Sequence, residues 1–271
     1  MSSGAEAAIA LVALVVLGGN DTMNQRRIFI GDIHGHYDAL IQLLDAIAPT
    51  QDDRVYFVGD LIDRGPKSAQ VVEFIKNSNY HCILGNHEQM LLNVLEQPDL
   101  PYNFRQAWLY GGGQATLDSY GENGIPEDHY HWIKSLPIYL DLDDIWLVHA
   151  GVHPELPIVE QTTDHFCWIR DEFHYMKEPF FPKKLIITGH TITFTIPGVL
   201  PGKLARGEGW IDIDTGAYHH QSGWLTGLDI TNGQVYQVNT YHQQQRQLPL
   251  DEAVTQINPN KSIYRRMTRS L

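Results

Sequence analysis

Six side chains of types that bind metal ions stand just after short apolar stretches of this sequence. They are Asp32, His34, Asp60, Asn86, His149 and His190. This mixture of carboxylate, amide and imidazole groups suits Mn, Fe, Zn or similar divalent ions better than a zinc site built from thiolates. Glycines flank most of the six, and they allow the tight turns and close backbone approach that a crowded ion site needs.

Each of these residues lies within a short polar motif. The motifs are Gly31-Asp32-Ile33-His34-Gly35, Gly59-Asp60-Leu61-Ile62-Asp63-Arg64-Gly65, Gly85-Asn86-His87-Glu88, His149-Ala150-Gly151 and Gly189-His190-Thr191. One such motif alone would be interpreted as a turn. Five of them, each after an apolar stretch, favour a single ion-binding site.

Short β-branched or aromatic stretches precede the motifs, which predicts strands that deliver functional groups at their carboxyl ends. The expected strands are Arg27–Ile30, Arg54–Val58, Cys82–Leu84, Ile145–Val148, Leu185–Thr188 and Trp210–Ile213. Helical spacing of apolar residues predicts helices over Tyr37–Ala48 and Lys67–Asn77. Trp224–Ile230 and Gln234–Asn239 form a hairpin pattern around Asn232-Gly233. Strands that alternate with helices predict an α/β layered fold.

From Ile28 to Gly216 the series of motifs resembles the PPP superfamily of metal-dependent phosphoprotein phosphatases, within the calcineurin-like metallophosphoesterases. The resemblance implies a β-sandwich of two mixed sheets flanked by helices, with a dinuclear metal site at the carboxyl ends of the strands. The implied ligands of the first metal are Asp32 and His34, Asp60 is shared, and Asn86, His149 and His190 bind the second.

Spacing and donor chemistry agree with this division. Asp32 and His34 are two positions apart, so in an extended segment they point to the same side. A carboxylate has two oxygens and can bridge, whereas Asn and His each give one donor to one ion. The expected cofactor is a pair of divalent ions, Mn²⁺ first and Fe or Zn as alternatives, which would activate a bridging hydroxide for attack on phosphorus.

The remaining roles fall on residues that are not ligands. The resemblance implies that His87 is the general acid and that Asp63 orients it. Arg64 can bind phosphate oxygens with its bidentate guanidinium. Arg170 is the best match for a second phosphate-binding arginine, and the alternative is a surface residue paired with Asp171 or Glu172.

The substrate expected first is a phosphoprotein or phosphopeptide carrying phosphoserine or phosphothreonine, with phosphotyrosine left open. The close alternative is symmetrical hydrolysis of diadenosine tetraphosphate or of another small phosphoester. Such hydrolases usually show Ala where this chain has Asp63, and Asp where it has Glu88, so both positions favour the protein phosphatases. A second alternative is a metal-binding regulatory module without catalysis, which the presence of His87 and Arg64 disfavours.

Composition limits the partners. The chain has 271 residues and a formal charge of −13, which excludes a broad basic face for nucleic acid and a polybasic membrane anchor. Cys82 and Cys167 are too few for a disulfide framework, so a cytoplasmic protein is expected, without nucleic-acid or membrane partners and as a monomer.

Three segments are expected along the chain. Residues 1–22 are an extension with a short apolar run, Ala7–Leu17, that is too short to span a membrane. Residues 23–241 form one catalytic domain, and residues 242–271 form a polar tail. Within the domain, Trp108–Gln114 is expected to form a loop on the substrate side.

Overall fold

Two six-stranded mixed sheets form the centre of the protein in the computed structural model, which describes residues 25–97, 99, 101–242 and 244–262. The first sheet has the order β11-β10-β9-β1-β2-β3. Its strands are β1 (Arg27–Ile30), β2 (Arg54–Phe57), β3 (His81–Cys82), β9 (Trp224–Asp229), β10 (Gln234–Asn239) and β11 (Gln245–Pro249). Strands β1, β2 and β3 are parallel, and β9, β10 and β11 join them as an antiparallel meander.

The second sheet has the order β12-β7-β8-β6-β5-β4. Its strands are β4 (Tyr139–Leu142), β5 (Ile145–Val148), β6 (Leu185–Thr188), β7 (Leu204–Gly207), β8 (Trp210–Asp212) and β12 (Val254–Gln256). Strands β5, β6 and β8 are parallel to one another. Each sheet therefore contains a group of three parallel strands whose carboxyl ends can present side chains at one edge.

Apolar side chains from both sheets pack together in one buried cluster, so the sheets form a sandwich. Phe29 and Leu228 come from the first sheet, while Leu147 and Ile211 come from the second. The fold is the predicted one, two mixed sheets flanked by helices. The strands are short, and their β-branched and aromatic residues suit a surface buried on both faces.

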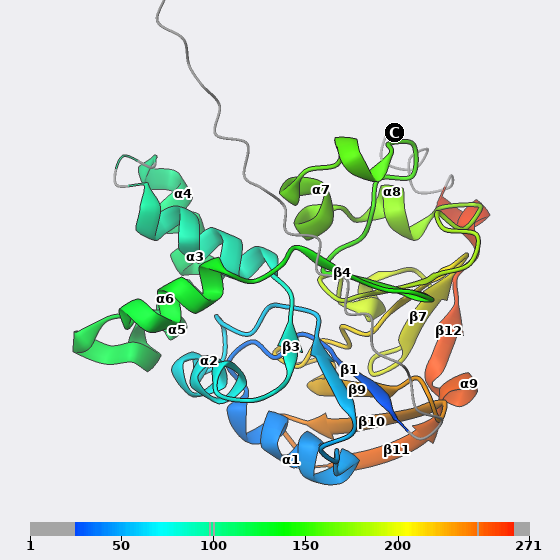
Figure 1. Cartoon of the computed structure of the whole chain (residues 1–271), viewed down its shortest axis with the longest axis horizontal. Helices are drawn as coiled ribbons and strands as arrows, with labels where there is room; N and C mark the ends of the chain where they lie inside the picture. Colours follow the sequence, from blue (N-terminus) through cyan, green and yellow to red (C-terminus); the bar gives the residue numbers. More distant parts are fainter. Residues whose placement is uncertain (1–24, 98, 100, 243, 263–271) are drawn as a thin grey trace, which may run out of the picture.

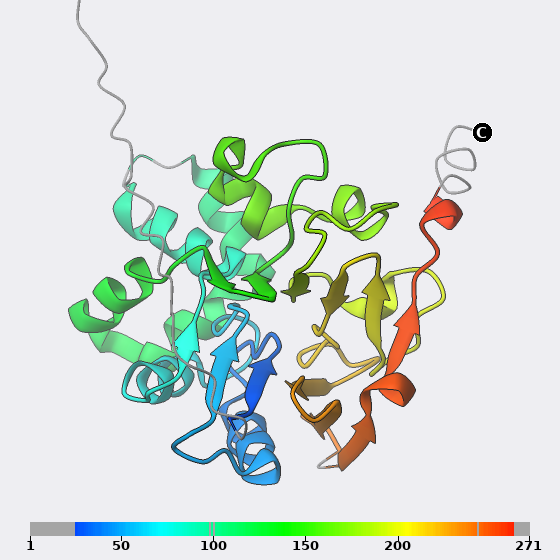
Figure 2. The ribbon, with the colours of Figure 1, turned by 45° about the vertical axis from the view of Figure 1, so that its right-hand side comes forward.

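Helices cover the outer faces of the sandwich and extend to one side of it (Figure 1). Helices α1 (Tyr37–Ile47) and α2 (Ser68–Lys76) pack with the first sheet in a second apolar cluster. Helices α7 (Thr163–Trp168) and α8 (Asp171–His174) lie by the second sheet, where Phe166 and Phe173 contact its core. Figure 2 shows the same arrangement turned about the vertical axis, with the right-hand side of Figure 1 brought forward.

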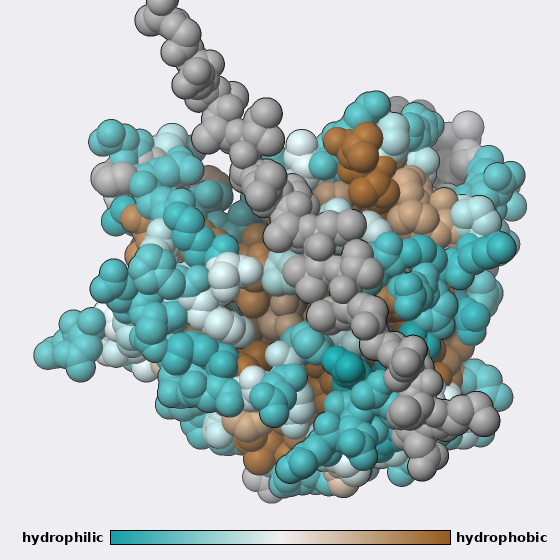
Figure 3. Space-filling model, in the orientation of Figure 1, coloured by the Kyte–Doolittle hydropathy of each residue, from teal (hydrophilic) through white to brown (hydrophobic). Residues whose placement is uncertain are grey.

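The connection between β3 and β4 is a set of helices that the sequence patterns did not predict. It contains α3 (Asn86–Glu96), α4 (Tyr102–Trp108), α5 (Gln114–Tyr120) and α6 (Glu127–Lys134). Mostly hydrophilic residues cover the visible surface of this part (Figure 3). None of the described helices is long and apolar enough to cross a bilayer.

The expected strands and the two expected helices are present, with ends that differ by one or two residues. The expected boundary after residue 241 is wrong, because β11 pairs with β10 and β12 pairs with β7. Helix α9 (Leu250–Ala253) links these strands, and Ala253 is fully buried. Polar residues such as Gln245 and Gln247 obscured the pattern because β11 is an edge strand. The extension 1–22 and residues 263–271 of the tail lie outside the described residues.

Truncation after residue 241 should destabilise the protein, because it removes an edge strand from each sheet and the buried side chains of Ala253 and Ile257. We expect a loss of about 2–5 kcal/mol in the free energy of unfolding, from the apolar surface that becomes exposed. Urea unfolding followed by circular dichroism measures this loss. Truncation after residue 262 is the control, and equal stability of the two shortened chains would contradict the role of these strands.

Candidate metal and phosphate site

The parallel strands of both sheets end at one place, and the polar motifs follow those ends. From the first sheet come Asp32 and His34 after β1, Asp60, Asp63 and Arg64 after β2, and Asn86 and His87 after β3. From the second sheet come His149 after β5 and His190 after β6. The six predicted ligands are all at most 6% exposed. Packing of the sandwich thus brings together residues that are up to 158 positions apart, such as Asp32 and His190.

Asp60 lies between two groups of donor atoms. On one side, His34 Nε2 is 3.5 Å from Asp60 Oδ2. On the other, His149 Nε2 is 3.3 Å from Asp60 Oδ1. Asn86 Oδ1 is 3.0 Å from His149 Nε2 and 2.8 Å from His190 Nδ1. The position of the Asp60 carboxylate between these two groups matches that of a carboxylate shared between two ion sites.

Two buried donor atoms of this cluster have no protein partner. Asp32 Oδ1 and His190 Nε2 are both inaccessible and form no hydrogen bond with the residues that the structure describes. A buried polar atom without a partner is costly, so an ion that these atoms bind would remove the cost. Gly189 leaves room for this arrangement, since a Cβ there would lie 2.0 Å from Asp32 Oδ1.

The histidines are held in the manner of metal ligands. His34 Nδ1 is 3.0 Å from the carbonyl oxygen of Ile62, and His149 Nδ1 is 2.7 Å from that of Val58. Such contacts fix the ring and leave the other nitrogen, Nε2, for a metal. Burial lowers the pKa of His34, His149 and His190, which favours the neutral rings that metal binding requires. The residues present therefore fit two divalent ions.

The predicted acid and its partner are in contact. His87 Nδ1 lies 2.5 Å from Asp63 Oδ2, and Asp63 is fully buried. Burial opposes a charged His87 ring, but the carboxylates of Asp60 and Asp63 outweigh it and raise the pKa of His87. His87 Nε2, the nitrogen that faces away from Asp63, is 3.1 Å from Arg64 Nη2. A guanidinium nitrogen can only donate, so His87 Nε2 is the acceptor in this contact and can present a proton only when Arg64 turns to another acceptor, such as a phosphate oxygen.

Both predicted phosphate arginines reach the ion site. The Arg64 guanidinium stacks on the ring of Tyr218, 3.9 Å from its centre. Arg170 Nη1 donates to Thr191 Oγ1 at 3.0 Å and approaches the carbonyl oxygen of His190 at 3.3 Å. Arg170 therefore contacts the turn that carries a predicted ligand.

Backbone strain is concentrated at this site. Seven non-glycine residues in the described part of the chain have positive φ, and five of them belong to the site. The five are His34, Asp60, Asp63, Arg64 and His190, with φ between 47° and 71°. Such conformations persist only when surrounding contacts enforce them, and they are typical of functional sites.

Several residues that shape the site gave no signal of that role in the sequence. The Glu88 carboxylate accepts the backbone N–H groups of Asp60 and Leu61 at 2.9 Å and 2.8 Å, so it supports the loop of the shared carboxylate. Trp108 Nε1 donates to Asp63 Oδ2 at 2.9 Å. Trp108 therefore lies behind the His87–Asp63 pair, whereas the sequence predicts it at the substrate side. Thr116 and Tyr218 have no local motif that could have identified them.

Comparisons with known proteins agree with this geometry. The chain matches the calcineurin-like phosphoesterase family over residues 26–199. It is 26% identical over 172 residues to the symmetrical bis(5'-nucleosyl)-tetraphosphatase of Haemophilus influenzae (strain PittEE), which is 58% of this chain and 56% of the relative. The enzyme of that name from Dechloromonas aromatica (strain RCB) is 36% identical over 129 residues, 46% of this chain and 44% of the relative.

The crystal structure of a putative diadenosine tetraphosphatase superposes with a TM-score of 0.57 at 22% identity, covering 83% of this chain and 93% of that one, which supports the fold. The matches span about half the length of the curated relatives. Since the family match covers more than half of the chain and all of the predicted ligands, the chain belongs to the calcineurin-like phosphoesterase family.

Proposed function

We propose that this protein is a metal-dependent hydrolase of phosphoric esters and anhydrides. The observation that carries the proposal is the position of the Asp60 carboxylate between two sets of ligand atoms, next to the His87–Asp63 pair. Asp32, His34 and Asp60 would hold one ion, and Asp60, Asn86, His149 and His190 the other, with Mn²⁺ as the proposed metal. Two such ions would supply positive charge for the phosphate oxygens and an activated water.

The residues around the ions have distinct roles in the proposed reaction. Arg64 and Arg170 bind phosphate oxygens and orient the group. Oxygen from water bonds to phosphorus as that water releases a proton to the solvent, and the bond from phosphorus to the leaving oxygen breaks. His87 Nε2 gives its proton to that leaving oxygen, and the ring then regains a proton from the solvent. Asp63 holds His87 Nδ1, so that Nε2 faces the substrate.

The substrate class we propose first is the dinucleoside tetraphosphates, split symmetrically. The names of the curated relatives support this class. The proposal therefore differs from the expectation based on the sequence, which placed phosphoproteins first. In the sequence, Asp63 and Glu88 favoured protein phosphatases. For Glu88 there is an explanation that does not depend on the substrate, because its carboxylate binds the loop that carries Asp60.

Phosphoserine or phosphothreonine proteins are the second candidate, and the Asp63–His87 contact favours them. The alkoxide released from a phosphorylated alcohol is a poor leaving group and needs a proton, whereas a nucleoside diphosphate leaves readily without one. A well-oriented general acid therefore accelerates hydrolysis of the ester more than hydrolysis of the anhydride. The predictions of a cytoplasmic monomer with no nucleic-acid or membrane partner stay predictions.

A parallel assay separates the two classes. We expect the Mn²⁺-loaded protein to convert diadenosine tetraphosphate into ADP with a higher kcat/KM than it shows for a panel of phosphoserine and phosphothreonine peptides. Chromatography of the products and release of phosphate measure the two reactions. A preference for the peptides would favour the second candidate, and no turnover of either class or of aryl phosphates would refute the proposed function.

Metal content should depend on the shared carboxylate. We expect two ions per chain by elemental analysis, and Asp60→Asn should reduce the content of both because a neutral amide is a weaker bridge. Asp45→Asn, which changes an exposed aspartate of α1, is the matched control and should retain both ions. Full metal content in Asp60→Asn would contradict the bridging role.

His87→Asn should lower turnover of phenyl phosphate about 10²- to 10⁴-fold because the general acid is lost. Metal content should not change, although His87 lies within reach of His34 and Asp60. His131→Asn, at a histidine of α6 whose side chain is 63% exposed, is the control. Loss of an ion from His87→Asn would indicate that His87 is a metal ligand. Unchanged turnover would contradict its role as the general acid.

A further inference from the structure

Asp63 is held by contacts from three different helices. Its Oδ2 is bound by His87 of α3 at 2.5 Å and by Trp108 Nε1 of α4 at 2.9 Å. Its Oδ1 accepts a hydrogen bond from Thr116 Oγ1 of α5 at 2.6 Å. The Asp63 N–H also donates to Thr116 Oγ1, at 2.8 Å. A fully buried carboxylate thus has both oxygens fixed by named donors.

The same helical connection fixes the residue after Asp63. The Arg64 N–H donates to the carbonyl oxygen of Gly112 at 3.0 Å. Gly112 lies between α4 and α5 and has a φ of 126°, and a Cβ there would lie 2.6 Å from Arg64 Cγ. Asp63 and Arg64 have strained φ values of 71° and 69°, so contacts from outside their own turn are needed to maintain them.

We propose that Thr116 and Trp108 are positioning residues for the general acid. Two donors on separate helices prevent rotation of the Asp63 carboxylate, and the carboxylate in turn fixes the His87 ring with Nε2 toward the leaving oxygen. The connection between β3 and β4 thereby has a part in proton transfer. This inference rests on the proposed function, since it assumes that His87 acts as the acid.

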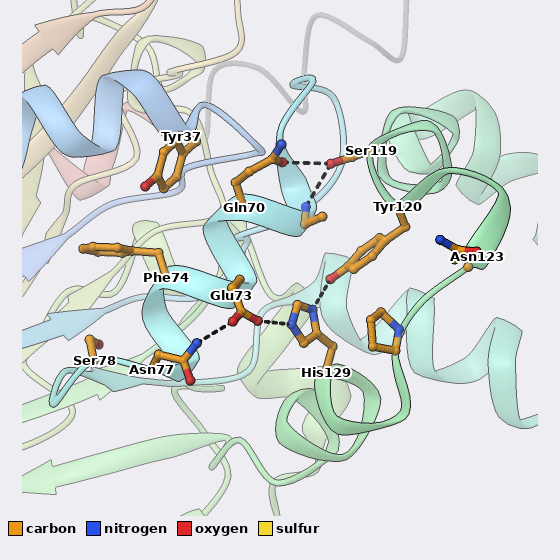
Figure 4. A pocket seen from close by; sticks show the side chains of 13 residues that line it. Tyr37, Gln70, Glu73, Phe74, Asn77, Ser78, Ser119, Tyr120, Asn123 and His129 are labelled. Carbon is orange, nitrogen blue, oxygen red and sulfur yellow. Dashed lines mark hydrogen bonds and ion pairs between the residues drawn. The ribbon is translucent and has the colours of Figure 1, made fainter.

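Thr116 and Ser119 both attach α5 to α2, since Thr116 Oγ1 also lies 3.1 Å from Ser68 Oγ of α2. One turn further along α5, Ser119 Oγ accepts the N–H of Ala69 at 2.9 Å and contacts Gln70 Oε1 at 3.3 Å (Figure 4). Beside it, a cavity of about 750 Å³ is lined by α2, the end of α5 and the start of α6, and Asp63 is not among its lining residues. Ser119 is therefore a matched control: a hydroxyl on the same helix, bonded to α2 but not to the catalytic pair.

The first test compares leaving groups. Thr116→Val keeps the shape of the side chain and removes the hydroxyl. It should lower kcat for phenyl phosphate about 10-fold or more, because a hydrogen bond to a charged group is lost. We expect a change of less than about 3-fold for 4-nitrophenyl phosphate, whose leaving group needs little help from an acid. KM should stay the same for both. Thr116→Ser should restore the ratio of the two rates, and Ser119→Ala should leave it unchanged.

The second test does not require turnover. In proton NMR spectra, the proton between His87 Nδ1 and Asp63 should give a far-downfield signal that is absent from His87→Asn. Thr116→Val and Trp108→Phe should shift or broaden this signal, and Ser119→Ala should not. If the native protein hydrolyses neither phosphate esters nor dinucleoside tetraphosphates, the proposed function fails, and this signal still decides whether Thr116 and Trp108 position the pair.

Two results would overturn the inference. One is a Thr116→Val protein with the native ratio of rates and the native signal. The other is an equal fall in both rates with an unchanged signal, which indicates a merely structural role. If Thr116→Val does not fold, Trp108→Phe carries the same two measurements, and a native ratio and a native signal in Trp108→Phe would overturn the inference.

Discussion

Burial of several carboxylates at one point is the constraint on which the rest of this structure depends. Asp32, Asp60 and Asp214 are each 2% exposed, and burial penalises their charge. Burial is the main reason that the pKa of Asp32 is raised, with Asp214 and Asp60 adding to it. Burial alone would also raise the pKa of Asp60, but the surrounding imidazoles outweigh burial, so the pKa of Asp60 is lowered. Two divalent ions would compensate for this charge, so the chain's formal charge of −13 does not describe what a phosphate meets here.

Neither sheet alone contains a complete site. Asp60 follows β2 in the first sheet and contacts His34 on the same side, yet its other oxygen faces His149 from the second sheet. The apolar interior of the sandwich therefore sets the distance between the two groups of ligands. Metal binding should be coupled to folding, because the unfolded chain has no such arrangement.

The helices between β3 and β4 connect the fold to the chemistry. They lie at one side of the sandwich (Figure 1), and their inner residues contact Asp63 and Arg64. Acid assistance matters most for a poor leaving group, so under the proposed function the order in this region bears on which phosphate bond would be broken. In that proposal the dinucleoside tetraphosphates rest on the names of the relatives, and the esters of an alcohol rest on the Asp63–His87 contact. The names of the relatives concern the group attached to the phosphate, and the Asp63–His87 contact concerns the bond that would break.

Local patterns in the sequence were enough to predict the candidate ligands, the strands that precede them and the layered α/β fold, because apolar stretches and glycine turns can be recognised without knowing the tertiary contacts. The sequence could not reveal Thr116, which lies 53 positions from Asp63, because a single threonine in a helix has no distinctive pattern. Nor could it place β11 and β12, whose polar residues resemble a tail until the two sheet edges are present. Only the tertiary structure decided these features, since packing between distant segments, and not local periodicity, creates their contacts.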